Sequence, residues 1–435
     1  MDEPQVSRTD DAAGDSRSMR ITYIHQYFTT PEMAGGTRSH DFARRLVEAG
    51  HEVNMITSAT DGRRQGGWFV TDEASITVHW LPVRYSNAMS YRARMVAFMK
   101  FVIGASIRAA SLKADVVFAT STPLTVAVPA VVAARWQRVP MVFEVRDLWP
   151  TVPIAMGALN NPLLRSTAKW LERWAYRNAE SVVALSPGMR DGIVATGYPR
   201  ERVAMIPNGS DLEGFKPDAR KAAAFRAARP WLGDRPLLLY AGALGRANGV
   251  SWLVQLTREL VPLVPDLRVL VIGDGFERSS VEAAASDGGL LNTVFFMEPP
   301  VAKGDVAAAF CAADMTACLF IGRESLWTGS PNKLFDSLAA GTPVLINYGG
   351  WQASLLETRN AGLVVPSADP ACSAQHVARI LNSRDELVAM GERARALAEE
   401  LFDRERHAHQ LLSVLHTARH NRGEFAADVS EGNSR

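Results

Sequence analysis

Cysteine is scarce in this chain of 435 residues. The three cysteines, Cys311, Cys318 and Cys372, are odd in number, and none lies near a cluster of histidines. Two of them fall in apolar runs. This pattern argues against a disulfide framework and a structural zinc site, so we expect a reduced, cytoplasmic chain.

Long uncharged apolar runs are also lacking. No run reaches the roughly 18 residues of a membrane-spanning helix, and the opening MDEPQVSRTDDAAGDSRS is too acidic for a signal peptide. Neither charge dominates, because 47 Lys and Arg against 46 Asp and Glu leave a net charge of +1. A general field for nucleic acid is therefore excluded, and any anion site must be local. We expect disordered ends at residues 1–18 and 423–435.

Apolar, β-branched runs alternate with amphipathic stretches throughout the chain. The predicted strands of the first half are RITYI, EVNMIT, ITVHWLPV, DVVFAT, PMVFEV, SVVAL and RVAMI. Those of the second half are PLLLYAG, RVLVIGDG, TVFFM, MTACLF, PVLIN and GLVVP. Continuous apolar strands that alternate with helices indicate parallel sheets covered on both faces. The sequence therefore predicts an α/β protein of two Rossmann-like, doubly wound domains.

The boundary between the domains falls in PNGSDLEGFKPDAR, about residues 207–220. This stretch is rich in Pro, Gly and Asp, and a new first strand follows it. We place the first domain at residues 19–210 and the second at 211–403. A last helix, about 404–421, follows the second sheet.

Glycine-rich turns follow several predicted strands, where helix N-termini offer free amides to a ligand. After the first strand come Gly35 and Gly36, which let the backbone approach a ligand, and Thr37, which is suited to cap the next helix. A plain flexible turn is the alternative.

Two further turns lie in the second half. One contains Gly242, Gly245 and Arg246, and its arginine can reach a phosphate, although the glycine spacing is not that of a dinucleotide-binding motif. The other contains Gly273 and Asp274 at the end of RVLVI, where a simple turn explains the pattern equally well.

The most informative segment is TGSPNKLFD, residues 328–336. Ser330 suits the N-cap of a helix, Pro331 its first position and Gly341 its C-terminal cap. Lys333 in the first turn opposes the helix dipole, so we expect an anion beside it. Asp336 shares a helix face with Lys333, and a cation with a hydroxyl-binding carboxylate suits a nucleoside diphosphate. A solvated Lys–Asp pair is the alternative.

Charged residues also end the strand PMVF. Glu144, Arg146 and Asp147 either point into a crevice or pair with one another. Trp149 and Trp327 are candidates for stacking on a sugar, although packing is the commoner role. His25, after the first strand, is equally readily a core histidine.

Together these segments resemble the large retaining glycosyltransferase family 4, whose architecture is called GT-B, over residues 20–420. The similarity is greatest to bacterial surface-polysaccharide enzymes that add N-acetylhexosamine-type sugars. It is carried by HQYF, GGTR, GHEVNMIT, EVRDLWP, ALSPGM, IPNGSDLEGF, YAGALGRANG, VIGDG and SPNKLFDSLAAGTPVL.

The resemblance implies two domains that face a cleft, with the last helix crossing back to complete the first. It implies that Arg246 and Lys333 stabilise the donor diphosphate and that Asp147 lies near the transferred sugar. Arg146 and Trp149 are assigned to the acceptor and sugar side. The implied donor-binding residues are Gly35, Gly36, Gly242, Gly245, Gly273, Asp274, Thr328, Ser330, Asn332, Asp336 (on the ribose) and Glu357 (supporting the pocket).

Two positions differ from the family pattern. The paired glutamates, eight residues apart, correspond to Thr328 and Asp336, and the usual Lys-Gly corresponds to Asn248-Gly249. Lys333 is then the cation that replaces the missing lysine. The subgroup that the chain resembles tolerates both changes.

A nucleotide-sugar-dependent transferase of this kind, with UDP the expected nucleotide, needs no cofactor, and we expect no metal because no carboxylate pair suits Mg²⁺. Cations and helix-end amides stabilise the leaving group instead. The expected acceptor is a glycan, a lipid-linked molecule or a small molecule. The alternatives are a dinucleotide-dependent oxidoreductase and a catalytically silent sugar- or lipid-binding protein of the same fold.

One predicted helix, within residues 90–113, has an apolar middle and basic flanks. It contains Arg92, Arg94, Lys100, Arg108 and Lys113 and no acid. Such a helix suits the surface of an anionic bilayer, which predicts peripheral association with the inner face of the cell membrane. The alternative is that its apolar face packs on the sheet.

Overall fold

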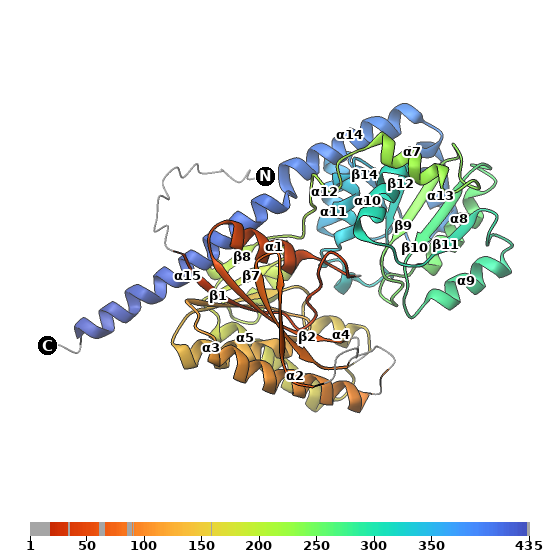
Figure 1. Cartoon of the computed structure of the whole chain (residues 1–435). Coiled ribbons are helices and arrows are strands. Elements are labelled where there is room, and N and C mark those ends of the chain that lie inside the picture. Colours follow the sequence, from red (N-terminus) through yellow and green to blue (C-terminus); the bar gives the residue numbers. More distant parts are fainter. Residues whose placement is uncertain are drawn as a thin grey trace.

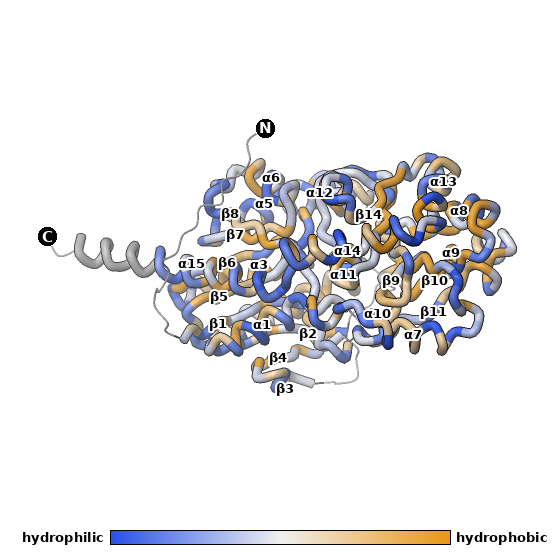
Figure 2. The backbone as a smooth tube through the Cα atoms, turned by 90° about the horizontal axis from the view of Figure 1, so that it is seen from above, coloured by the Kyte–Doolittle hydropathy of each residue, from blue (hydrophilic) through white to orange (hydrophobic). Residues whose placement is uncertain are grey.

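The computed structural model describes residues 18–33, 35–60, 66–84, 89, 91–157 and 159–432, without the side chains of residues 91, 92, 94 and 422–432. Figure 1 shows two α/β domains side by side. The disordered lead predicted for residues 1–18 lies outside the described residues except for Ser18. In Figure 2 hydrophobic backbone segments coincide with strands such as β10, inside their domain.

The first domain contains an eight-stranded sheet in the order β3-β4-β2-β1-β5-β6-β7-β8. Every strand pairs in parallel except β3, which is antiparallel to β4. The strands are β1 (Arg20–Ile24), β2 (Glu52–Ala59), β3 (Phe69–Glu73), β4 (Ile76–Pro82), β5 (Val116–Thr120), β6 (Met141–Val145), β7 (Ser181–Ala184) and β8 (Val203–Met205).

Helices cover both faces of this sheet. The first-domain helices are α1 (Arg38–Glu48), α2 (Tyr91–Ser111), η1 (Leu124–Val126), α3 (Ala127–Gln137), α4 (Thr151–Ala155), α5 (Pro162–Asn178), α6 (Pro187–Ala195) and η2 (Arg200–Arg202). α2, α3 and α5 share one buried apolar cluster with one face of the sheet, whereas α1 packs in the cluster of the other face. The nearly all-apolar strands follow from this two-sided burial.

The second domain has a six-stranded parallel sheet in the order β11-β10-β9-β12-β13-β14. Its strands are β9 (Leu237–Ala241), β10 (Arg268–Ile272), β11 (Phe295–Glu298), β12 (Met315–Cys318), β13 (Val344–Ile346) and β14 (Gly362–Val364). Its helices are α7 (Ala219–Ala227), α8 (Ser251–Leu260), α9 (Arg278–Asp287), α10 (Lys303–Ala312), η3 (Glu324–Leu326), α11 (Asn332–Ala339), α12 (Trp351–Arg359), α13 (Pro370–Leu381) and α14 (Arg384–Leu401). The predicted fold, two doubly wound domains, is confirmed.

The chain crosses between the domains twice, and the two crossings pair. The Ser210 amide donates to the Phe402 carbonyl (3.0 Å), and the Arg404 amide donates to the Ser210 carbonyl (3.2 Å). The last helix, α15 (Arg404–Gly432), then runs along the first domain (Figure 1). Its buried apolar side chains belong to the apolar cluster of that domain: Ala408, Leu411, Leu415 and Ala418.

Two features differ from the sequence-based expectations. β3 is not among the predicted strands. The disordered tail expected from residue 423 is instead helical backbone as far as Gly432. Its Glu and Ala residues are good helix formers, and extending an existing helix avoids the cost of nucleation. Among the described residues, no helix is long and apolar enough to cross a membrane.

Candidate functional site

A cleft of about 400 Å³ opens between the two domains. The first-domain residues that line it, at the carboxyl ends of strands or in the segments that follow them, are His25, Tyr27, Gly36, Thr122, Arg146, Asp147, Leu185 and Asn208. Across the cleft stand Phe320, Gly329, Ser330, Pro331 and Asn332, which follow β12 and lead into α11. The carboxyl edge of a parallel sheet is where open α/β folds bind ligands.

The three charges at the end of β6 separate into a buried carboxylate, Glu144, and two cleft residues. The buried Glu144 carboxylate accepts from Arg38 (2.8 Å) and from the Thr120 hydroxyl (2.6 Å). Arg38 also donates to the Pro207 carbonyl (2.7 Å), which ties α1 to the end of the first domain. With Glu144 paired in this way, Arg146 and Asp147 line the cleft.

Burial decides the protonation of two cleft side chains. It raises the pKa of Asp147 to about 6, and the nearby Arg146 cation only partly opposes this shift. Burial, helped by Arg146, holds the pKa of His25 well below its usual value, so the imidazole is neutral. His25 Nε2 lies 3.5 Å from the Arg146 guanidinium. The cleft therefore offers a neutral imidazole, a carboxyl with a pKa of about 6 and a guanidinium group.

Several buried polar atoms in this cleft have no hydrogen-bond partner among the described residues. They are His25 Nδ1, Asn208 Oδ1 and Asn332 Oδ1. An unpaired polar group of this kind costs about 1–3 kcal/mol. A ligand rich in hydroxyl or amide groups would satisfy these atoms.

The loop before α11 holds the domains together. The Ser186 hydroxyl donates to the Thr328 carbonyl (2.6 Å), and the Asn208 amide donates to the Ser330 hydroxyl (3.1 Å). The prediction that Ser330 caps α11 is wrong. Pro331 is the N-cap, and the serine hydroxyl instead accepts a hydrogen bond from the other domain. The predicted glycine cap is confirmed, since Gly341 follows α11 with φ +65°.

Thr37, the other predicted cap, also bonds the other domain instead of capping its helix. It precedes α1 without a capping bond, and its hydroxyl donates to Asp41 (2.8 Å) and accepts from Lys303 of the second domain (2.8 Å). Arg404, at the start of α15, also bonds Asp41. Both predicted caps therefore hold the two domains together.

A second cluster lies at the carboxyl ends of β9 and β10. A Cβ on Gly273 would lie 1.9 Å from the Gly242 carbonyl oxygen, and one on Gly242 would lie 2.9 Å from Lys333 Cε. Lys333 Nζ donates to the Tyr240 hydroxyl (2.8 Å) and lies 4.3 Å from the centre of that ring. Burial raises the pKa of Tyr240, so the phenol stays neutral and leaves the lysine charge uncompensated. Lys333, in the first turn of α11, is thus placed to bind an anion.

The remaining predicted residues of the two turns, after β9 and after β10, lie nearer the surface. Arg246 is exposed and stacks on the Phe276 ring, 4.1 Å from its centre. Asp274 is exposed, and its carboxylate accepts from the Gly275 amide (2.8 Å). Gly245 is close to Asn248, whose amide donates to the Ala243 carbonyl (2.8 Å) and so braces the turn.

Four further predicted residues lie outside both the lining of the cleft and the cluster at the ends of β9 and β10. Asp336 accepts from the Ser210 hydroxyl (2.8 Å) at the domain junction, and burial raises its pKa. Glu357 is exposed in the last turns of α12. Trp149 packs against the core of the first domain. Gly35 is exposed beside Thr29, next to the cleft residue Gly36. Their assigned roles remain predictions.

The sequence-based set omitted Tyr27, Thr122, Asn208 and Phe320. Each lies within three residues of the end of a strand, so a systematic search of strand ends would have found them. Motif spacing does not identify them, because they follow four different strands that are far apart in the sequence.

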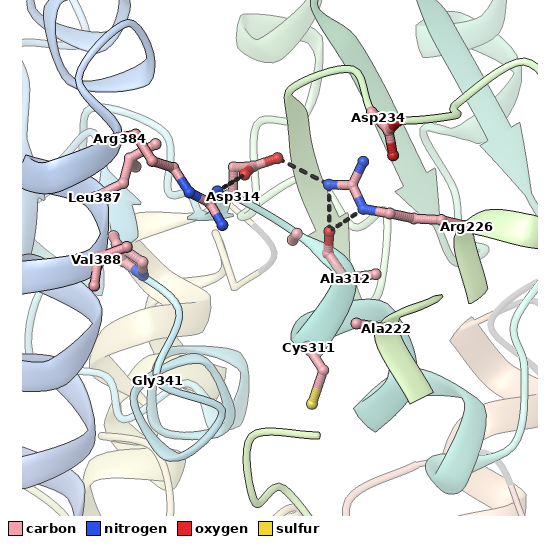
Figure 3. A pocket seen from close by; sticks show the side chains of 12 residues that line it. Ala222, Arg226, Asp234, Cys311, Ala312, Asp314, Gly341, Arg384, Leu387 and Val388 are labelled. Carbon is pink, nitrogen blue, oxygen red and sulfur yellow. Dashed lines mark hydrogen bonds and ion pairs between the residues drawn. The ribbon is translucent and has the colours of Figure 1, made fainter. Parts of the chain in front are cut away.

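A second hollow, of about 440 Å³, lies in the second domain. Figure 3 shows Arg226 directed at Asp314 and the Ala312 carbonyl, with Arg384 on the other side of Asp314. Arg226 bonds both groups at 2.7–2.9 Å. Asp314 and Pro343 immediately precede β12 and β13, so this hollow is at the amino edge of the sheet, and Arg226 is a structural clamp.

Among the described residues, no group of three His, Cys, Asp or Glu is placed to hold a metal ion. The cations Arg146, Arg246 and Lys333 are instead the charged groups on hand for a negatively charged ligand.

Two family models match the chain. Residues 34–209 match the Glycosyl transferase 4-like domain, and residues 235–383 match Glycosyl transferases group 1. Together they cover most of both domains.

Curated relatives are similar at 24–27% identity in three examples. A D-inositol 3-phosphate glycosyltransferase of Corynebacterium urealyticum is 27% identical over 60% of this chain and 64% of that protein. One of Xylanimonas cellulosilytica is 27% identical over 83% of this chain and 87% of that protein. A GDP-mannose-dependent alpha-(1-6)-phosphatidylinositol monomannoside mannosyltransferase of Mycolicibacterium smegmatis is 24% identical over 83% and 89%. The match thus spans less than two thirds of the first of these relatives.

Solved structures share the fold. Sucrose-phosphate synthase from Thermosynechococcus elongatus has a TM-score of 0.74 at 19% identity, over 94% of this chain and 100% of that one. HepE from Anabaena, in complex with UDP-glucose, has a TM-score of 0.69 at 16% identity, over 92% and 100%.

Proposed function

We propose that this chain, whose two halves match a glycosyltransferase 4-like domain and a glycosyltransferase group 1 domain, moves a sugar from a UDP-linked, N-acetylhexosamine-type donor with retention of configuration. The proposed acceptor is a glycan, a lipid-linked molecule or a small molecule of polysaccharide biosynthesis. Retention and the sugar type rest on the resemblance to family 4 and its surface-polysaccharide subgroup.

The observation that carries this proposal is the position of Lys333. Its ammonium lies at the N-terminal turn of α11, beside a neutral phenol and the backbone of Gly242. A cation and free amides that point at one place form an anion site. A diphosphate bound there would lie beside Asn332, which lines the cleft.

The cleft supplies groups suited to a sugar. The unpaired atoms of His25, Asn208 and Asn332 suit hydroxyl groups. Asp147, with a pKa of about 6, can accept or donate a hydrogen bond near neutral pH. Because hydroxyl recognition needs such paired donors and acceptors in a dry site, we assign the transferred sugar to the side of Asp147 and Arg146.

Catalysis then rests on charge. As the sugar–phosphate bond breaks, negative charge develops on the nucleoside diphosphate, and Lys333, Arg246 and the α11 amides stabilise it. The leaving phosphate oxygen accepts the proton of the acceptor hydroxyl, so the protein need not provide a general base. Arg246 stacks on the exposed Phe276 ring and would have to leave it to reach this site.

The nucleotide is the least constrained part of the proposal. HepE was crystallised with UDP-glucose, whereas other relatives are named GDP-mannose-dependent. We assign UDP because the resemblance to the N-acetylhexosamine subgroup favours it. GDP is the competing outcome.

Thermal shift with UDP, GDP, UDP-N-acetylglucosamine and NADH tests the proposal. A ligand present at 100 times its Kd stabilises the fold by about 2.7 kcal/mol. UDP and its sugar should raise Tm, and NADH should not. Release of UDP from UDP-N-acetylglucosamine would show transfer or hydrolysis. This release should be lost in Asp147→Asn and kept in Lys221→Ala, a control at an exposed position. Stabilisation by NADH alone would instead support an oxidoreductase, and binding without turnover a silent protein.

A further inference from the structure

Exposed apolar side chains gather on one side of the first domain. Among the described residues, seventeen large hydrophobic side chains are exposed, and ten of them belong to α2, α3 and α5. They are Met95, Val96, Met99, Ile103 and Ile107 on α2, Val132 and Trp136 on α3, and Leu163, Leu164 and Trp170 on α5. Apolar side chains exposed together in this way mark an interaction site.

The helix α2 is apolar on both sides. Its inward face buries Ala97, Phe101 and Ala105 against the sheet. Val96 (68% exposed), Ile103 (57%) and Ile107 (69%) point the other way. Packing on the sheet, which is the sequence-based alternative for this helix, therefore explains only the inward face. It leaves the exposed apolar side chains of the outer face without a role.

All three helices expose the same side of the domain. α2, α3 and α5 pack in one buried cluster against one sheet face, and α2 contacts α3, which contacts α5. Figure 1 shows them in one layer along that face. Their outward sides therefore form one surface, which we call the three-helix face.

The three-helix face is strongly basic. The three helices contain nine Lys and Arg residues and one acid, Glu172, which is buried. The recorded partners of Lys100 and Arg135 are neutral groups, the Pro82 carbonyl and the Asn178 amide oxygen. Since the whole chain has a net charge of only +1, its positive charge is concentrated here.

We propose that the three-helix face binds the surface of an anionic lipid bilayer. An anionic bilayer presents charged headgroups above its acyl chains. The cations of these helices match the headgroups, and their exposed aliphatic side chains match the acyl chains. Trp136 and Trp170 supply the aromatic side chains that favour the membrane interface. A nucleic acid would match the charge but leave the aliphatic side chains in water.

The orientation of the helices connects this face with the cleft. α2 and α5 follow β4 and β6, so their first turns lie at the carboxyl edge of the sheet, where the cleft opens. Leu163 and Leu164 occupy the first turn of α5, and Met95 directly follows the first turn of α2. A lipid-linked acceptor in the bilayer would thus reach the cleft from its rim. This last step rests on the proposed function, whereas bilayer binding does not.

The test is co-sedimentation with vesicles of phosphatidylcholine, with and without phosphatidylglycerol, at low and high salt. The full chain should sediment with the anionic vesicles at low salt and be released by high salt. Val96→Ser/Ile103→Ser/Ile107→Ser should abolish binding, while the matched second-domain control Leu263→Ser/Val388→Ser/Leu401→Ser should bind normally. Lys169→Gln/Arg173→Gln should weaken binding about 30-fold, because each cation near the surface contributes about a fivefold factor.

These substitutions change exposed side chains, so circular dichroism should show native folding. Equal binding to both vesicle types, no binding to either, or normal binding by the triple first-domain variant would overturn the proposal. Self-association removed by that variant, without vesicle binding, would assign the face to a second copy of the chain. UDP-sugar binding, measured in parallel without vesicles, tests the proposed function separately.

Discussion

Asp147→Asn should make the protein more stable and less active. The folded pKa of Asp147 is about 6, against 3.8 for a free aspartate, because burial penalises the charged carboxylate. A carboxyl whose pKa is raised favours the fold while it is protonated, and that contribution is lost as the pH rises through 6. Above this pH the wild-type cleft therefore holds a charge at a cost in free energy.

The size of this cost follows from the shift. Two pKa units correspond to about 2.7 kcal/mol, and because Asp147 is partly accessible we expect about 1–3 kcal/mol at pH 8. Asparagine keeps the shape and has no charge to bury. Each kcal/mol moves Tm by about 2–4 °C in a domain of this size.

The assay is the Tm of both proteins at pH 5 and pH 8 at equal ionic strength. The variant should gain Tm at pH 8 and much less at pH 5. Asp266→Asn, an exposed carboxyl of the second domain, should show no such difference. UDP release should fall in Asp147→Asn alone. A variant that gains nothing at pH 8, or gains equally at both pH values, would refute the argument from burial.

Three further substitutions separate binding, turnover and folding. Lys333→Ala should weaken UDP binding by about 1.5–3 kcal/mol in calorimetry, with little change in Tm because the Tyr240 hydroxyl keeps its bond to a carbonyl; unchanged affinity would reject the anion site. Asp336→Asn should lower kcat in steady-state kinetics if the carboxylate holds the ribose, and wild-type kinetics would leave Asp336 only its contact with Ser210. Arg38→Met should lower the free energy of unfolding by about 3–5 kcal/mol, since Glu144 would stay buried without its partner; a loss below 1 kcal/mol in urea unfolding would show that the pair is not structural.

Periodicity predicted the strands well because both sheets are buried on both faces. A strand such as β10 reads as a continuous apolar run, and its register follows from burial. β3 was missed because it lies at the edge, with no fully buried residue, and its pairing with β4 positions it. Tertiary pairing of this kind leaves little trace in a short polar strand.

The cleft was partly predictable for a related reason. The end of a strand identified Arg146 and Asp147, because this feature is local, whereas Asn332 was implied by the family resemblance. The partners of Thr37 and Ser330 were not predictable. A hydroxyl before a helix is a good cap only when no better partner is near, and here the better partner belongs to the other domain.

The residues that violate local rules are the ones to which the proposed chemistry is assigned. Asp147 is a carboxyl held where burial opposes its charge, and Lys333 is a cation at the positive end of a helix. By contrast, Arg226 and Glu144 have their charges fully paired, and both belong to the scaffold. Natural proteins accept local conflict mainly where function requires it. The uncompensated charges of this chain therefore locate the proposed donor site more sharply than its glycine spacings do.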